Sequence, residues 1–125
     1  MPAYSLSAAL FVYDKQNKPT RDLAAAVEQV AAAGFTEVEV SAEGDSWPRV
    51  VGGEIGPLKT ALERAGVFPH TLHAPLIGIN LASEVDAIRR DGIDKMAAAL
   101  RVQGELGGRS VIVHLSLIHI SAPTR

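Results

Sequence analysis

Glu39, His73 and His114 each stand at or near the end of a short segment of apolar and β-branched residues. Imidazole nitrogens bind divalent metal ions and transfer protons, and a carboxylate accepts hydrogen bonds or acts as a general base. In proteins built from parallel strands and helices, the active site lies at the carboxyl ends of the strands. These three residues are therefore the first candidates for one shared site.

The alternation of side chains along a strand predicts which of these residues face the same way. In the segment FTEVEVS, Val38 and Val40 share the face that should meet helices, which leaves Glu39 on the inner face. His73 and His114 are expected on this inner face too, at one level of two strands about 4.8 Å apart. Their rings could hold one metal ion, with nitrogen–metal distances of about 2.0–2.1 Å, or they could hydrogen-bond a polyol.

Other interpretations of these residues stay open. A single histidine at a strand end is more often structural than functional, and Glu39 could bond to the backbone or to a lysine. His70 falls on the helix side of its segment, and we interpret it as a packing or capping residue. Trp47 follows a strand, where its ring could form a wall of a sugar pocket or simply cover the core.

Segments of strand and helix type alternate along the chain. The predicted strands cover residues 4–12, 35–41, 67–74 and 110–114, with a loop at 42–53. Three helices are predicted from the residues at their ends. The first has Thr20 as N-cap and ends at Gly34, and the second has Pro57 in its first turn and ends at Gly66. The third begins with the capping pattern of Ser83 and Asp86 and ends at Gly107. The order βαβαβαβ predicts an α/β protein with parallel strands, either an open doubly wound sheet or part of a closed (β/α)8 barrel. The glycine-rich fingerprints of common nucleotide-binding folds are missing.

The composition of the chain excludes several classes of function. The formal net charge of −2 gives no basic surface for nucleic acid, and the absence of cysteine excludes disulfides and thiolate chemistry. The first residues do not resemble a signal peptide, and no apolar run approaches the ~20 residues of a membrane helix. We therefore expect a cytoplasmic protein without membrane or nucleic-acid partners.

The last residues, 115–125, read LSLIHISAPTR and resemble the translated sequence of a transposon-type sequencing adapter, LSLIHISEPTR, with Ala122 as the one difference. We interpret this tail as an artefact and assign no role to His119. The predicted natural domain then covers residues 1–114, and its continuation is missing.

The segment from His73 to Ser83, HAPLIGINLAS, resembles the H-A-P-x-x-x-I-N-L-A-S stretch that follows the third strand in the xylose isomerase-like barrel superfamily. The segments GFTEVEVS and GGRSVIVH resemble the second and fourth strands of that superfamily. The resemblance implies the N-terminal half, about four βα units, of a (β/α)8 TIM barrel. Its implied pocket residues are Glu39, His73, Asn80 and His114. The resemblance implies His73 and His114 as metal ligands in the endonuclease IV-like branch of the superfamily, whereas in the isomerase branch these positions more often line the substrate pocket.

The resemblance also implies a function for the whole protein, namely a metal-dependent isomerase or epimerase of a sugar, sugar phosphate or polyol. A carboxylate would remove a proton next to a carbonyl, and a divalent metal (Zn, Mn, Mg or Co) would stabilise the developing negative charge. The catalytic base and most metal ligands are expected in the missing half, so the piece alone is expected to be inactive and need not bind the metal.

Two alternatives from other classes remain open. The first is an endonuclease IV-like phosphodiesterase acting at abasic DNA, although the chain lacks a basic stripe for phosphates. The second is a truncated, non-catalytic binding domain. If the chain is a half-barrel, its two open sheet edges are also expected to promote self-association.

Overall fold

The computed structural model describes residues 4–9, 22–42 and 47–115, and in these ranges it shows one four-stranded parallel sheet. The strands are β1 (Ser5–Ser7), β2 (Glu37–Ser41), β3 (Phe68–His73) and β4 (Ser110–Ile112). The helices are α2 (Leu23–Ala32), α3 (Trp47–Val51), α4 (Gly56–Ala65) and α5 (Asp86–Leu106).

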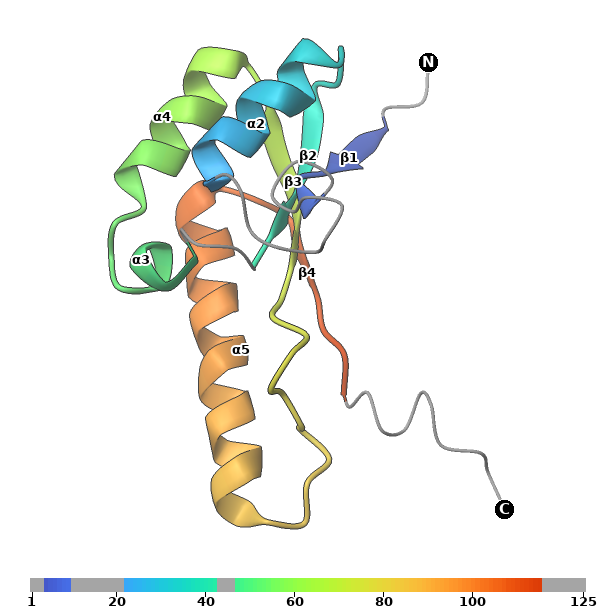
Figure 1. Ribbon diagram of the computed structural model, residues 1–125, viewed down its shortest axis with the longest axis vertical. Coiled ribbons are helices and arrows are strands. Elements are labelled where there is room, and N and C mark those ends of the chain that lie inside the picture. Colours follow the sequence, from blue (N-terminus) through green and yellow to red (C-terminus); the bar gives the residue numbers. More distant parts are fainter. Residues whose placement is uncertain (1–3, 10–21, 43–46, 116–125) are drawn as a thin grey trace.

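The strands lie side by side in the order β1-β2-β3-β4, which is also their order in the chain. The four helices all lie on one side of this sheet (Figure 1). An open doubly wound sheet would carry helices on both sides. The arrangement is that of consecutive units in a (β/α)8 barrel, so the predicted fold class is confirmed.

The core lies between the sheet and the helices. Val38, Val40 and Leu72 point to this side and are 0% exposed, where they meet Leu23 and Leu58 of the helix layer. Fully burying a side chain of this size contributes roughly 1.5–3 kcal/mol. The period-two alternation of β2 thus places its valines on the helix side and Glu39 on the inner side, as predicted.

The ends of the helices agree with the sequence only in part. Gly34 follows α2 with a φ of 88°, as predicted for a terminating glycine. The N-cap of α2 is Asp22, whose carboxylate accepts a hydrogen bond from the backbone of Ala25, so the prediction of Thr20 was wrong. Thr20 itself lies outside the described residues.

The start of α5 also differs from the prediction. Its N-cap is Val85, which makes no side-chain capping bond, and Ser83 instead accepts from the backbone N–H of Val85 in a turn before the helix. The capping pattern of Ser83 and Asp86 is therefore two residues too early for a capping box. Asp86 instead forms ion pairs with Arg89 and Arg90 on the exposed surface.

An irregularity in the pairing of β2 and β3 changes the alternation along β3. Glu37 pairs with Phe68, but Glu39 pairs with Thr71, so β3 contains one extra residue between these positions. Pro69 lies in this stretch and has no N–H group to donate to the neighbouring strand, which favours such a bulge.

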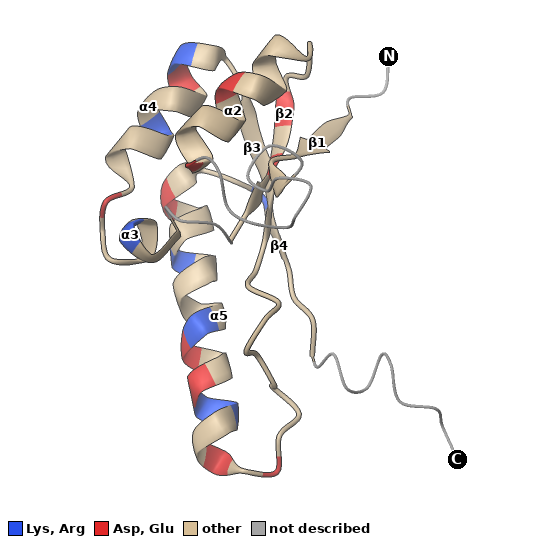
Figure 2. Cartoon of the chain, viewed as in Figure 1, with Lys and Arg blue, Asp and Glu red and all other residues tan. Residues whose placement is uncertain are grey.

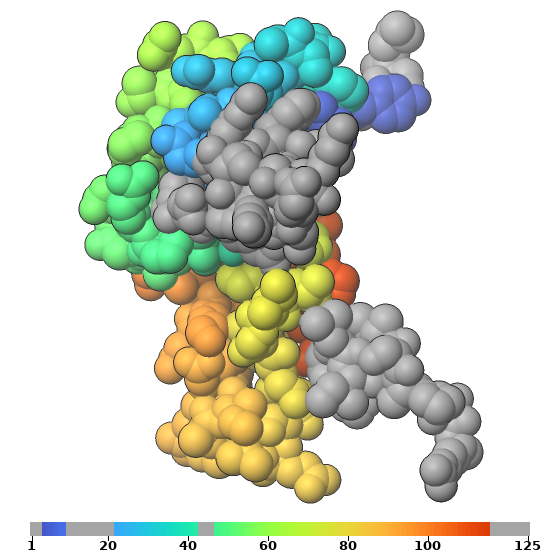
Figure 3. Space-filling model, viewed as in Figure 1, coloured from blue at the N-terminus to red at the C-terminus, as the bar shows by residue number. Residues whose placement is uncertain are grey.

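Helix α5 has 21 residues, whereas α2 and α4 have 10 each. Its first half extends beyond the carboxyl ends of the strands, beside the chain that connects β3 to α5 (Figures 1 and 3). Acidic and basic residues are interspersed along α5 (Figure 2). None of the helices in the described ranges is both long and apolar enough to cross a membrane.

Candidate functional site

The rings of His73 and His114 meet at the carboxyl ends of β3 and β4. Their Nε2 atoms are 3.2 Å apart, the ring centroids are 5.1 Å apart, and the ring planes are inclined by 50°. Both side chains are half-buried. The prediction that these two residues, 41 positions apart in the chain, face the same side of the sheet is confirmed.

The two histidines are not at the same level of the sheet, contrary to the prediction. His73 pairs in register with Ile112, so His114 lies two residues further along. It follows the end of β4, and the hydrogen bond from the backbone of Leu81 to the carbonyl of Leu115 runs beside it. The rings therefore approach each other diagonally, which their length permits.

This geometry allows two chemical states. In one, an Nε2–H of one ring donates to the Nε2 of the other ring. In the other, both Nε2 atoms bind one cation, since two nitrogens of a tetrahedral zinc site are about 3.3 Å apart. Among the described residues, no cluster of three or more His, Cys, Asp or Glu side chains forms a metal site, so the pair supplies two ligands.

Glu39 lies on the inner face of β2, two residues before Ser41, which is the residue that pairs with His73. Its Oε1 accepts a 2.8 Å hydrogen bond from Ser7 Oγ of β1. The carboxylate is half-buried, and this partner is a hydroxyl rather than the backbone or a lysine. One carboxylate oxygen thus stays available for a ligand on this face.

Asn80 lies in the segment that follows β3, and its side chain forms a local turn. Its Oδ1 accepts a 3.2 Å hydrogen bond from the backbone N–H of Ala82. The segment is held beside β4 through the bond from Ala74 N–H to the carbonyl of Ile112. Asn80 thus forms a turn, and a contact between Asn80 and a substrate remains a prediction.

His70 and Trp47 belong to the supporting structure. Nδ1 of His70 lies 3.1 Å from Thr71 Oγ1, and the ring of His70 packs edge-on against Phe68. The prediction that His70 lies on the helix side assumed regular alternation of side chains along the strand. The bulge interrupts this alternation at His70. Trp47 begins α3, a helix within the predicted loop 42–53, and its ring is part of the core at 9% exposure.

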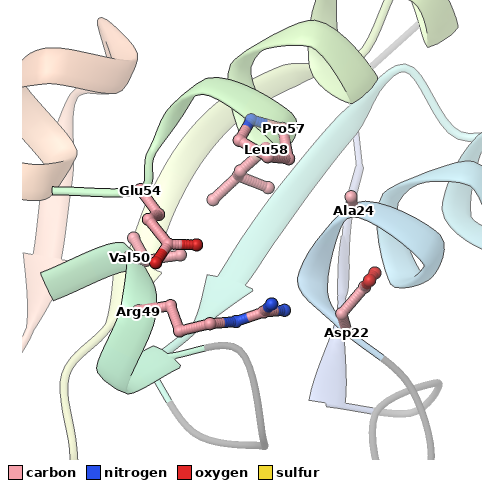
Figure 4. A pocket seen from close by; sticks show the side chains of 7 residues that line it. All are labelled: Asp22, Ala24, Arg49, Val50, Glu54, Pro57 and Leu58. Atoms are coloured by element: carbon pink, nitrogen blue, oxygen red, sulfur yellow. The ribbon is translucent and has the colours of Figure 1, made fainter. Parts of the chain in front are cut away.

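Two of the cavities in the described ranges are lined in part by residues of α3. The smaller, about 60 Å³, lies between α2, α3 and α4, where Arg49 extends between Asp22 and Glu54 (Figure 4). It has room for only a few water molecules. The larger, about 390 Å³, has a mainly apolar lining that includes Trp47, Pro75 and Lys95. The sequence analysis predicted neither cavity.

Comparisons with known proteins give one family and two similar folds. The family model of the xylose isomerase-like TIM barrel matches residues 27–123. A crystal structure of D-psicose 3-epimerase in the presence of D-fructose is similar, with a TM-score of 0.57, 22% identity and 74% of this chain covered. So is the apo structure of the 3-keto-D-glucoside 4-epimerase YcjR from E. coli, with a TM-score of 0.62, 16% identity and 83% covered.

The chain spans about a third of the length of these two proteins, 31% of the first and 36% of the second. At these levels of identity, the likeness concerns the fold. No curated protein matches the chain in sequence.

Proposed function

The chain belongs to the xylose isomerase-like TIM barrel family, and from this we propose that it forms the first half of a metal-dependent isomerase or epimerase acting on a sugar or polyol. The observation that carries this proposal is the convergence of His73 and His114 at the carboxyl ends of β3 and β4. In a (β/α)8 barrel this is the end at which substrates bind. The two similar structures support the substrate class, since both proteins are named as epimerases of sugars.

Each residue on the inner face has a role in this proposal. His73 and His114 hold one divalent cation through their Nε2 atoms, which are already 3.2 Å apart. A cation bound there would polarise a carbonyl or hydroxyl oxygen of the substrate. Glu39 accepts a hydrogen bond from a substrate hydroxyl through the oxygen that Ser7 does not use. The proton-transferring base is placed on later strands of the whole barrel.

Cobalt binding tests the metal part of the proposal without relying on activity. Co²⁺ held by imidazole nitrogens gives visible absorption bands, so the chain can be titrated directly. We expect one bound ion, and we expect His73→Ala and His114→Ala each to lower its affinity by at least tenfold. His70→Ala is the matched control, since this histidine is on the same strand but outside the pair. Equal effects of all three substitutions would contradict the proposed site.

Activity is tested with the whole protein. Incubation with D-fructose and other ketoses, with and without Mn²⁺ or Co²⁺, is expected to give an epimer or isomer detectable by chromatography. The same preparation is assayed on a DNA duplex with an abasic site. Cleavage of the duplex without conversion of any ketose would reverse the ranking in favour of a phosphodiesterase.

A separate part of the proposal is that the chain is a fragment of a longer protein. It rests on the resemblance of residues 115–125 to an adapter sequence, and residues 116–125 lie outside the described ranges. Sequencing genomic DNA of the locus past the codon of His114 tests it. A reading frame that continues into further strand and helix patterns is expected, and a stop codon directly after Arg125 would favour a short, non-catalytic domain.

A further inference from the structure

A row of four polar side chains crosses the inner face of the sheet at one level. The strand register pairs Ser7 with Glu39, Glu39 with Thr71, and Thr71 with Ser110. The interior of a (β/α)8 barrel is usually filled at such levels by bulky, branched apolar side chains. Hydroxyl and carboxylate groups in their place would be costly to bury without hydrogen-bond partners.

The row consists of two hydrogen-bonded pairs with a gap between them. Ser7 Oγ donates to Glu39 Oε1 at 2.8 Å, and Thr71 Oγ1 lies 3.0 Å from Ser110 Oγ. Among the hydrogen bonds of the described residues, none joins Glu39 to Thr71, although β2 and β3 are direct neighbours.

One hydroxyl group can span two neighbouring strands of a sheet. Adjacent strands are about 4.7–4.9 Å apart. An oxygen atom that makes two hydrogen bonds of about 2.8 Å at a tetrahedral angle joins partners about 4.6 Å apart. One hydroxyl could therefore bridge the carboxylate of Glu39 and the hydroxyl of Thr71.

The donors and acceptors around the gap also suit a hydroxyl. His70 Nδ1 lies 3.1 Å from Thr71 Oγ1, so Thr71 can accept from both His70 and Ser110. The hydrogen of Thr71 is then free to be donated into the gap. Glu39, as a carboxylate, can only accept there. A group that accepts from Thr71 and donates to Glu39 completes the row, and an alcohol does both.

Resting on the proposed function, we infer that Glu39 and Thr71 form a subsite for a hydroxyl group at the far end of the substrate. Thr71 lies two residues before His73 on the same strand, which places this level about 6.6 Å below His73 and further below His114. A three-carbon ketose is too short to reach both levels, whereas an open-chain six-carbon ketose is long enough. The subsite would thus select the longer substrates.

The test compares two ketoses on the full chain in the presence of Zn²⁺. Binding of D-fructose and of dihydroxyacetone is measured by NMR chemical-shift titration. Thr71→Val removes the hydroxyl but keeps the shape of the side chain, and Thr60→Val on the exposed surface of α4 is the matched control. We expect Thr71→Val to weaken D-fructose binding about 3- to 10-fold, the range for one lost hydrogen bond. Binding of dihydroxyacetone, and both affinities in Thr60→Val, should stay unchanged.

Each other outcome counts against a stated claim. If D-fructose binds the unaltered chain and Thr71→Val weakens both ketoses equally or neither of them, the subsite is wrong while the sugar-binding proposal stands. If neither ketose binds the unaltered chain, the subsite fails in this chain, whereas the proposed function is decided separately by the ketose assay on the whole protein. Should Thr71→Val lose its helical circular dichroism, Ser110→Ala takes its place, because it removes the hydroxyl that holds Thr71 in the row.

Discussion

The side-chain amide of Gln103 occupies the space that a side chain on residue 108 would need. A Cβ atom on Gly108 would lie 2.0 Å from Gln103 Nε2 and 2.5 Å from the carbonyl oxygen of Pro69. From this position Nε2 lies within 3.0–3.3 Å of the carbonyl oxygens of Pro69, His70 and Ser110. The end of α5 is thereby joined to the beginnings of β3 and β4.

We expect Gly108→Ala to destabilise the chain by about 2–3 kcal/mol, because either Gln103 or the backbone of β3 must move. Urea denaturation followed by circular dichroism measures this effect. Gly104→Ala is the control, since a Cβ atom at this position within α5 meets nothing within 4 Å. That substitution should instead stabilise the chain by about 0.5–1 kcal/mol through helix propensity. Similar effects of the two substitutions would contradict the role of Gln103.

Asp22 closes the first turn of α2, and its removal should be measurable. Asp22→Ala is expected to lower the free energy of unfolding by about 1 kcal/mol, because the backbone N–H of Ala25 loses its 2.8 Å partner. Asp22→Asn should retain most of the stability, since an amide oxygen can accept the same bond. If thermal or urea denaturation finds the Ala and Asn variants equally stable, the hydrogen bond from Ala25 to the side chain of residue 22 contributes little to stability.

Self-association of the chain is expected from its exposed apolar surface. Strands β1 and β4 are the outer strands of the described sheet, and Ile93 and Leu100 on α5 are 52% and 58% exposed. Ile93 and Leu100 are seven residues apart and so lie on one side of the helix. We expect Leu100→Glu to shift sedimentation toward the monomer, whereas Val85→Glu, at the far end of the helix, should not. A chain that is monomeric at all concentrations and melts cooperatively would contradict this.

The local patterns of the sequence predicted most of the fold. The alternation of Glu37 to Ser41 identified β2 and its two faces, because burial of Val38 and Val40 depends only on period two. The same rule brought His73 and His114 to one side of the sheet. Helix α3 was missed, although Trp47, Val50 and Val51 recur at helical spacing, because five residues give too short a pattern.

Features that depend on two segments at once were not predictable in this way. The two-residue offset between His73 and His114 follows from the register of β3 and β4, which neither strand specifies alone. The bulge in β3 shifted Thr71 into line with Glu39. Thr71 and Ser110, which belong to the row that carries the proposed subsite, were not among the predicted site residues, although their parity with His73 and His114 was a usable signal.

The order of the strands in space, β1-β2-β3-β4, repeats their order of synthesis. Each strand therefore pairs with the strand that precedes it in the chain, and loop closure spans only the helices between the two. A nascent chain of this design can add one strand at a time, because no strand needs a partner from a distant part of the sequence. When a further unit of strand and helix is added at the C-terminal end, during translation or by gene duplication, the strand pairs that already exist stay intact.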